Sequence, residues 1–260
     1  MPTDSAASLS PVMPLTGRRA LVTGGGRGIG RAIAAALTAQ GADVTVLGRS
    51  AAALDATVAA GDAVRAIACD VTDRAALATA IASAGDLDIL VNNAGHAETA
   101  SIRRMEAALF DRMIALNLTA VFDGIHAVLP GMVARGSGRI VSVASTAGLT
   151  GYPYVSAYCA AKHGVVGLTR ALAREVATSG VTVNCVCPGF TETDLVAGSV
   201  DTIVAKTGRT AEAALADLTK SMPIGRLIKP QEVAGAVLWL VSDQAAAVTG
   251  IALPVAGGEI

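Results

Sequence analysis

Aromatic residues are scarce in this 260-residue sequence, where Phe, Tyr and Trp together make up 3% and Trp occurs once. Charged residues make up 16%, and the 20 Lys and Arg nearly balance the 21 Asp and Glu, which leaves a net charge of −1. Proteins that bind nucleic acid depend on an excess of positive charge. We therefore expect no nucleic acid partner.

Long apolar runs are also lacking, although hydrophobic residues make up 52% of the chain. No run approaches the roughly 18 residues of a membrane span. Residues 1–16 contain no Lys or Arg and no apolar segment of the kind found in secretory signals. We expect 1–16 to be a flexible tail, 17–260 to form one domain, and the protein to act in the cytoplasm without a membrane.

Cysteine occurs only four times, at Cys69, Cys159, Cys185 and Cys187. Their spacing matches no metal site, and we expect none. Cys185 and Cys187 alternate on a predicted strand and so point to one face. Because free Cys behaves as a small hydrophobe, we interpret both as packing residues rather than redox partners.

What the chain does contain is a regular alternation of short β-branched runs with longer Ala- and Leu-rich stretches of helical period. This pattern predicts βα units and a Rossmann-type doubly wound parallel sheet of about seven strands flanked by helices. The predicted strands are Arg19–Val22, Asp43–Leu47, Val64–Cys69, Asp88–Val91, Gly138–Ala144, Val181–Val186 and Gly250–Pro254. The predicted helices are Gly28–Ala39, Ala51–Ala59, Arg74–Ser83, Glu106–Met132 with an interruption near Asn117, Val155–Ser179 and Gln231–Val241.

One segment, residues 191–222, departs from this rhythm. It is the longest insertion between a predicted strand and the next helix, and it mixes glycine and polar residues with two short helical patterns. Long loops at the carboxyl ends of parallel strands commonly cover ligands, so we interpret it as a small helical lid over a substrate. A peripheral helical pair is the alternative.

A Gly-rich turn follows the first predicted strand, with Gly24, Arg27, Gly28, Ile29 and Gly30 at the opening of a helix. Glycines there allow a tight turn and let a phosphate approach backbone N–H groups at the positive end of the helix. The strict G-x-G-x-x-G pattern is absent, but the position directly after the first strand predicts a phosphate site.

The end of the second predicted strand indicates which dinucleotide binds. Its residues Leu47-Gly48-Arg49-Ser50 lack the carboxylate that would bond a ribose 2′-hydroxyl and repel a 2′-phosphate. Arg49, with Arg27 in the nearby turn, suits the extra phosphate of NADP(H). NAD(H), with Arg49 simply facing solvent, is the alternative.

A phenol and an ammonium lie on one predicted helix. Tyr158 and Lys162 are spaced i to i+4 and so share a face of it. A nearby ammonium stabilises phenolate, so we expect Lys162 to lower the pKa of Tyr158 from about 10 toward neutrality. Ser145, at the end of the fifth predicted strand, can hold a substrate oxygen beside the phenol. This set predicts proton transfer to and from a carbonyl or alcohol.

The Gly-rich turn, Asn92-Asn93-Ala94-Gly95, Asn117, Ser145 and the Tyr158/Lys162 pair occur in one chain in this order. In combination the chain resembles the short-chain dehydrogenase/reductase family from about Gly17 to Gly258. The resemblance implies that Tyr158 protonates the carbonyl, Lys162 binds the nicotinamide ribose, Ser145 orients the carbonyl and Asn117 holds a water of the proton relay. It also implies cofactor contacts, at Asp70, Val71, Asn92, Ala94, Gly95, Pro188, Gly189, Thr191 and Thr193, beside those at Arg49 and Ser50.

From Asn117 onward the chain is similar to ketoreductases that act on β-ketoacyl thioesters. The sequence His96-Ala97-Glu98 departs from the Pro-Gly-Gly that aromatic-polyketide reductases carry at that point. The expected pocket is apolar, with His96, Leu149, Tyr152, Tyr154, Phe190 and Leu195 around a ketone. We expect reduction of a 3-oxoacyl thioester; the alternatives are a secondary alcohol dehydrogenase acting on a free ketone, and an inactive dinucleotide-binding sensor or scaffold.

The family resemblance also implies a homotetramer, with a dimer as the alternative. The predicted helix Val155–Ser179 carries small residues on several sides, including Gly164, Gly167 and Ala171, which allow two helices to approach closely. We expect this helix and the helix around Glu106–Met132 to pair with their symmetry mates.

Overall fold

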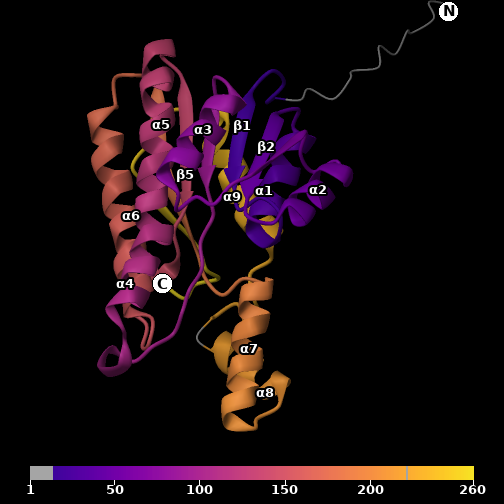
Figure 1. The fold of residues 1–260 in the computed structure, drawn as a ribbon, viewed down its shortest axis with the longest axis vertical. Coiled ribbons are helices and arrows are strands. Elements are labelled where there is room, and N and C mark those ends of the chain that lie inside the picture. The colour runs from indigo at the N-terminus through magenta and orange to yellow at the C-terminus, as the bar shows by residue number, and fades with distance from the viewer. Residues whose placement is uncertain (1–13, 221) are drawn as a thin grey trace, which may run out of the picture.

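A seven-stranded parallel sheet runs through the part of the chain that the computed structural model describes, residues 14–220 and 222–260 (Figure 1). The order is β3-β2-β1-β4-β5-β6-β7. The strands are β1 (Arg19–Thr23), β2 (Asp43–Gly48), β3 (Arg65–Ala68), β4 (Ile89–Asn92), β5 (Gly138–Val143), β6 (Val181–Pro188) and β7 (Ala252–Val255). The predicted doubly wound sheet and all seven predicted strands are confirmed, with ends that differ by a few residues.

The direction of winding reverses between β1 and β4. Leu21 of β1 pairs with Thr45 of β2 on one side and with Leu90 of β4 on the other. In open α/β sheets, ligands bind outside the carboxyl ends of the strands at such a point. The topology therefore places a binding crevice at the ends of β1 and β4.

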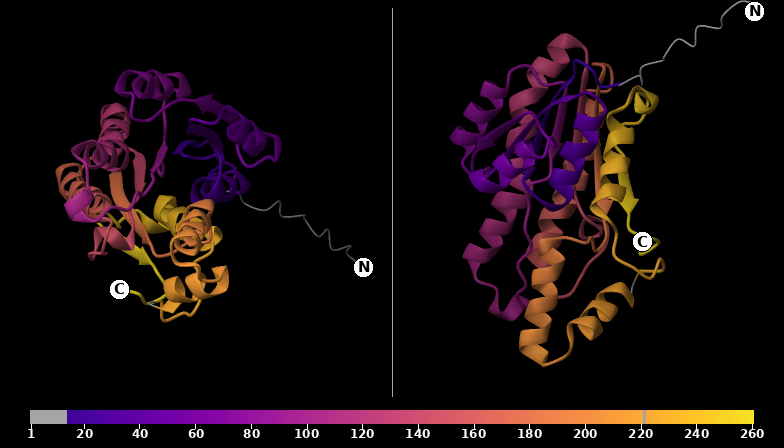
Figure 2. Two further views of the ribbon diagram at one scale, coloured as in Figure 1. Left: turned by 60° about the horizontal axis from the view of Figure 1, so that its bottom comes forward. Right: turned by 90° about the vertical axis from the view of Figure 1, so that its right-hand side faces the viewer.

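Helices cover both faces of the sheet, which Figure 2 shows from two further sides. One face packs against α1, α2 and α9, and the other against α3, α5 and α6. Their bounds are α1 (Gly28–Ala39), α2 (Ala51–Ala59), α3 (Arg74–Ala84), α4 (Ala107–Ile114), α5 (Ala120–Arg135), α6 (Ser156–Glu175) and α9 (Pro230–Val241). Two of these helices have a side-chain N-cap. The Ser50 hydroxyl accepts from the N–H of Ala53 at the start of α2, and the Asp73 carboxylate accepts from the N–H of Ala76 at the start of α3.

Burial of the strands explains their continuous apolar sequences. All eight residues of β6 and all four of β4 are buried, as expected of parallel strands covered on both faces. Cys185 and Cys187 are fully buried in the core beneath α6, which agrees with packing residues. The predicted tail needs one correction: Leu15 is 4% exposed, so it belongs to the core, and residues 1–13 lie outside the described part of the chain.

The predicted interruption near Asn117 is a π-helical turn, Ala115–Thr119, between α4 and α5. Single π-turns inside α-helices frequently occur at functional sites. The continuous helical stretch Ala107–Arg135 is long and apolar enough to cross a membrane by length and composition, with a hydropathy of 1.4. In the fold, however, α5 packs against α3 and the sheet, and core helices of this kind pass the same test.

The predicted lid consists of two helices, α7 (Asp194–Thr207) and α8 (Ala211–Lys220), between β6 and α9. Figure 1 shows them extending from one end of the sheet, which is the end where β6 finishes. A parallel bridge between Thr191 and Ile228 closes the base of this excursion. The lid thus projects from the carboxyl edge, where the topology places the crevice.

Candidate functional site

The Gly-rich turn packs so tightly that side chains have no room at two of its positions. A Cβ on Gly30 would lie 2.2 Å from the carbonyl oxygen of Gly24, and one on Gly25 would lie 2.4 Å from Val46. Gly24 and Gly28 adopt positive φ values of 67° and 51°. The turn therefore brings bare backbone to the amino end of α1, as the sequence predicts for a phosphate site.

A residue that the sequence analysis did not single out, Asn93, holds this turn to β4. Its side-chain amide donates to the carbonyl oxygens of Thr23 and Gly24, at 2.9 and 3.2 Å. The backbone N–H groups of Asn93 and Ala94 in turn donate to the hydroxyl of Thr23. Its place directly after a strand and beside Asn92 was the available signal.

Asn92 itself is buried, and its amide lies 3.5 Å from the hydroxyl of Ser142 on the neighbouring strand. A Cβ on Gly124 of α5 would lie 2.7 Å from the side-chain oxygen of Asn92. The amide of Asn92 is therefore packed closely against α5. Asn92 also lines a small cavity with Thr23 and Val71. Its predicted contact with a cofactor stays a prediction.

Two arginines, Arg49 and Arg27, are expected near the adenosine, and each has a carboxylate nearby. Arg49 is exposed after β2, and its charge is one of the influences that lower the pKa of Asp70, after the hydrogen bonds from Thr72. Arg27 lies 3.8 Å from Asp194 at the start of α7, and both side chains are exposed. Ser50 caps α2, so its hydroxyl already has a structural partner.

Tyr158 and Lys162 do share one face of α6, as their spacing predicts. The ammonium of Lys162 lies 5.5 Å from the centroid of the Tyr158 ring and donates to the carbonyl oxygen of Val143 at 2.7 Å. Ser145 follows β5 and hydrogen bonds with the Tyr158 phenol, while its hydroxyl accepts from the N–H of Ala147. The structure thus assembles three of the four predicted catalytic side chains at one point.

The predicted direction of the Tyr158 pKa is wrong for the chain by itself. Burial raises the pKa of the phenol to about 12, and the hydrogen bond from Ser145 offsets only part of this effect. Burial also lowers the pKa of Lys162 to about 8. The Lys162 ammonium donates to the Val143 carbonyl and is not among the influences that shift the pKa of Tyr158.

Asn117, the fourth predicted catalytic residue, is fully buried in the π-turn. Its amide donates to the carbonyl oxygens of His96 and Met113, and its oxygen accepts from the N–H of His96. A Cβ on Gly95 would lie 2.9 Å from that oxygen and 3.6 Å from the Lys162 ammonium. Asn117 therefore fixes the backbone of the segment after β4 directly beside Lys162.

The end of β6 brings the predicted Pro188–Thr193 segment to the same edge. Pro188 pairs with Val255, and the hydroxyl of buried Thr191 donates to the carbonyl oxygen of Gly189 at 3.0 Å. A Cβ on Gly28 would lie 3.2 Å from the Thr193 methyl group. The first turn of the lid thus touches the Gly-rich turn across the crevice.

Only part of the predicted substrate pocket gathers there. Tyr152 and Phe190 contact edge to face, with ring centroids 6.4 Å apart, and Leu149 packs on the core. Tyr154 does not join them: its side chain is 66% exposed, its φ is 67°, and its carbonyl oxygen accepts from the N–H of Ala100. His96 is exposed and meets Asn117 through its backbone; the side chain of Leu195 lies outside the described residues.

No group of three or more His, Cys, Asp or Glu side chains within residues 14–220 and 222–260 is placed to hold a metal ion. The side chains at this edge that can take part in proton transfer are those of Tyr158, Lys162 and Ser145. Their arrangement can give a proton to an oxygen held beside Ser145, or take one back.

Comparison with known proteins identifies similar chains. Residues 18–204 match the short chain dehydrogenase family. A 3-oxoacyl-(acyl-carrier-protein) reductase of Vibrio harveyi is 42% identical over 95% of this chain and 98% of its own length. The 2-(S)-hydroxypropyl-CoM dehydrogenase 3 of Xanthobacter autotrophicus is 43% identical over 91% of this chain and 94% of its own. A solved structure of a variant actinorhodin polyketide ketoreductase with NADPH has a TM-score of 0.87 at 39% identity, covering 93% of this chain and 97% of that one.

Proposed function

The chain belongs to the short-chain dehydrogenase/reductase family, and on that premise we propose that it is an NADP(H)-dependent ketoreductase acting on a 3-oxoacyl thioester. Reduction of the ketone to a secondary alcohol is the reaction that Tyr158, Ser145 and Lys162 support. The single observation that supports the proposal is geometric: the Tyr158 phenol lies beside Ser145, with the Lys162 ammonium 5.5 Å from its ring, at the carboxyl edge of the sheet. A phenol placed in this way can give its proton to a ketone oxygen held beside Ser145.

The residues at the carboxyl edge fit a dinucleotide. The bare backbone at Gly24, Gly28 and Gly30 leaves room that a Cβ would fill, beside the amino end of α1. Arg49 and Arg27 would hold a 2′-phosphate, and no carboxylate stands at Gly48 to repel it. The relative solved with NADPH supports the same preference, with NAD(H) as the alternative.

When bound, NADP(H) would supply or accept the hydride at its nicotinamide ring. The chain's own part is to hold the ketone and move the proton. Ser145, fixed by the N–H of Ala147, orients the carbonyl oxygen next to the Tyr158 phenol, which donates its proton as that oxygen gains charge. Lys162 would bind the nicotinamide ribose, and Asn117, whose amide also donates to the His96 carbonyl, would hold a water of the proton relay.

The test compares substrates at one cofactor concentration. We expect NADPH-dependent reduction of acetoacetyl-CoA, with NADPH preferred over NADH in kcat/KM. Absence of detectable thioester reduction at millimolar concentration would exclude the thioester while leaving the ketoreductase reaction open. A clear preference for NADH would contradict the role given to Arg49.

The second candidate is a secondary alcohol dehydrogenase acting on a small free ketone. It is favoured by the relative from Xanthobacter autotrophicus, a 2-(S)-hydroxypropyl-CoM dehydrogenase. A panel of free ketones and their alcohols in the same assay separates the two. Higher kcat/KM for a free ketone than for the thioester would support this candidate.

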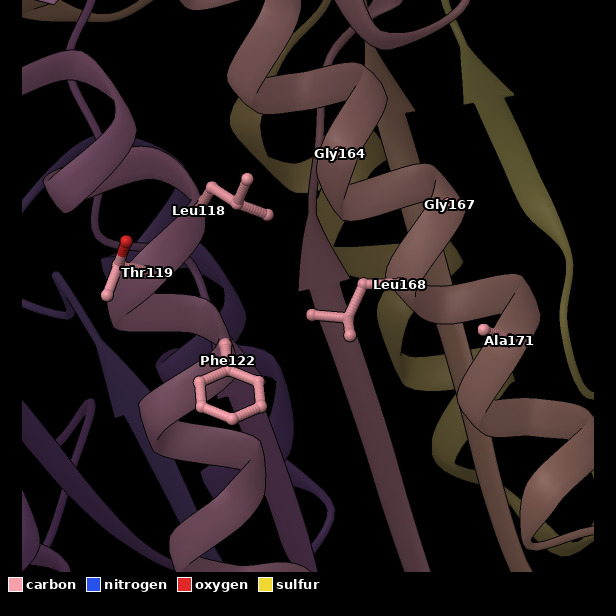
Figure 3. A pocket seen from close by; sticks show the side chains of 7 residues that line it. All are labelled: Leu118, Thr119, Phe122, Gly164, Gly167, Leu168 and Ala171. Carbon is pink, nitrogen blue, oxygen red and sulfur yellow. The ribbon is translucent and has the colours of Figure 1, made fainter. Parts of the chain in front are cut away.

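We also propose that the protein assembles with copies of itself, into a homotetramer, through the face that α5 and α6 share. A groove of about 460 Å3 lies between them, lined by side chains that are nearly all apolar (Figure 3). Its residues are Leu118, Thr119, Phe122, Gly164, Gly167, Leu168 and Ala171. An exposed apolar surface of this kind marks a contact with another protein, and Phe122 is 44% exposed in it.

Gly167 allows a test of this assembly without damage to the fold. A Cβ at this position would meet nothing within 4 Å in the single chain, so Gly167→Trp has room in the protomer but fills the groove. We expect sedimentation to give a tetramer for the unmodified protein and a smaller species for the variant. An unchanged mass for Gly167→Trp would place the interface elsewhere.

The free, buried state of the four described cysteines suits a reducing compartment, so we propose a cytoplasmic location.

A further inference from the structure

A carboxylate from the segment after β7, Glu259, reaches the edge of the sheet where the catalytic residues lie. Its Oε1 accepts a hydrogen bond from the Tyr152 hydroxyl at 2.6 Å. Its Oε2 lies 2.9 Å from the position that a Cβ on Gly189 would occupy. Tyr152 also contacts Phe190, so Glu259 lies between the aromatic pair and the end of β6.

Hydrogen bonding fixes this carboxylate relative to the catalytic serine. A carboxylate only accepts, so the Tyr152 hydroxyl donates its one proton to Glu259 and accepts from the hydroxyl of Thr146, 2.9 Å away. Burial, followed by the bond to Glu259, raises the pKa of Tyr152 to about 12, so the phenol keeps this proton. Thr146 directly follows Ser145, which connects Glu259 to the site of the carbonyl.

The other oxygen of the same carboxylate is left without a partner. Oε2 is buried and has no hydrogen bond to any residue that the structure describes. Glu259 also forms no ion pair within 4 Å of a described Lys, Arg or His. Buried acceptors are rarely left unpaired, because the unpaired state costs free energy. The carboxylate therefore keeps unused capacity to accept a hydrogen bond beside Tyr152.

We infer that Glu259 is a specificity-determining residue, which favours ketones that carry a hydrogen-bond donor or a positive charge near Tyr152 and rejects ketones that carry a carboxylate there. The inference rests on the proposed ketoreductase function and specifies its substrate further. Attraction to donors and repulsion of anions both follow from a negative charge held beside Tyr152 and Phe190, two of the residues expected around the ketone.

A purely structural role for Glu259 makes a different prediction. If the carboxylate only anchored the segment after β7 to Tyr152, its removal would lower stability and leave the choice between neutral and anionic ketones unchanged. The ratio of kcat/KM for two ketones with one carbon skeleton therefore separates the roles.

The probes are ethyl acetoacetate and acetoacetate, each with NADPH as reductant. We expect the unmodified protein to favour the neutral ester by about 100-fold or more in kcat/KM. Glu259→Gln keeps the size of the side chain and an oxygen for Tyr152, and removes the charge. It should raise kcat/KM for acetoacetate at least tenfold, mainly through KM, and change that for the ester less than threefold.

Glu192→Gln is the matched control, because Glu192 is an exposed carboxylate on the segment after β6. It should leave the ratio of the two ketones unchanged. Glu259→Ala gives the same comparison if Glu259→Gln does not fold, with folding judged by thermal melting and NADPH binding. Tyr152→Phe removes the anchor but keeps the charge, so discrimination against acetoacetate should persist.

An unchanged ratio in an active Glu259→Gln variant would overturn this inference and leave the proposed function standing. Failure of the unmodified, NADPH-binding protein to reduce any ketone would overturn the proposed function, and the inference with it. A gain for acetoacetate in Glu192→Gln equal to that in Glu259→Gln would show a general charge effect and also overturn the inference.

Discussion

The Gly-rich turn and the lid meet at the same edge of the sheet, yet their glycines serve opposite purposes. In the turn, a Cβ on Gly30 would lie 2.2 Å from the Gly24 oxygen. In the lid, a Cβ on Gly198 would meet nothing within 4 Å, and Gly208 is required only by its own φ of 67° at the end of α7. Packing therefore dictates the shape of the turn, whereas no close packing dictates these two glycines of the lid.

The largest expected effect on activity comes from Tyr158, which lies on α6, outside both the turn and the lid. Tyr158→Phe keeps the ring and removes the phenol proton, so kcat for ketone reduction should fall by about 100- to 10,000-fold, the usual contribution of a general acid. The dissociation constant for NADPH should change less than threefold, because the Gly-rich turn is untouched. Stopped-flow reduction and fluorescence titration of NADPH measure the two quantities.

Equal losses in turnover and cofactor affinity for Tyr158→Phe would mean that the two regions are not separable. Ser145→Ala provides a matched comparison, since it removes the hydroxyl that orients the carbonyl and leaves the acid in place. We expect a smaller loss of kcat than in Tyr158→Phe.

The next effect contrasts the glycines directly. In Gly30→Ala the methyl group would collide with the Gly24 oxygen and, at 2.4 Å, with the Asn93 amide, so the turn must open. We expect NADPH affinity to fall by about 100-fold or more, together with a lower melting temperature. Gly198→Ala, inside α7, is the control, and should leave affinity within twofold because nothing contacts the new methyl group. Similar losses in both variants would contradict the difference between turn and lid.

The sequence predicted best those features of the site that local backbone structure determines. Two helices, Gly28–Ala39 and Ala51–Ala59, begin and end as predicted. The Gly-rich turn fixes the start of the first helix, and the Ser50 cap fixes the start of the second. Tyr158 and Lys162 share a face because helical spacing alone decides it. Asn93 was missed because its role depends on contact with β1, which is distant in the sequence.

Residues predicted to line the substrate pocket were placed less well, because contacts between distant parts of the chain decide where these side chains lie. Tyr154 was predicted in the pocket, but it lies at the surface, 66% exposed, in a loop whose positive φ at this residue the sequence does not announce. Glu259 follows the last strand, and no local pattern indicates that it meets Tyr152. The pKa of Tyr158 was predicted in the wrong direction because burial, which sequence does not quantify, raises it and the hydrogen bond from Ser145 offsets only part of the rise.

Cofactor selectivity offers a finer test of the turn side of this contrast. Arg49→Leu removes the cation expected at the 2′-phosphate and leaves the tight backbone of the turn intact. Charge-assisted hydrogen bonds contribute about 1.5–3 kcal/mol, so the preference for NADPH over NADH should fall by roughly 10- to 100-fold. Steady-state kinetics with both cofactors measure it. A loss shared equally by NADH would assign Arg49 to the fold instead.

The smallest expected effect, about tenfold at pH 9, comes from Lys162 alone. Its pKa of about 8 lies within the working range, whereas Tyr158 at about 12 stays protonated. If the ammonium binds the ribose, kcat/KM for reduction should fall about tenfold per pH unit above pH 8, and Lys162→Arg should shift this fall to higher pH.

The free energy of unfolding should change in the opposite sense. Between about pH 8 and 10 the unfolded chain binds the Lys162 proton and the folded chain does not, so folding is favoured as pH rises. Melting temperatures of the unmodified protein and Lys162→Met, compared over this range, isolate that contribution. A difference that stays constant with pH would mean that the lysine remains charged in the folded protein, and the site would then need another origin for the activity limb.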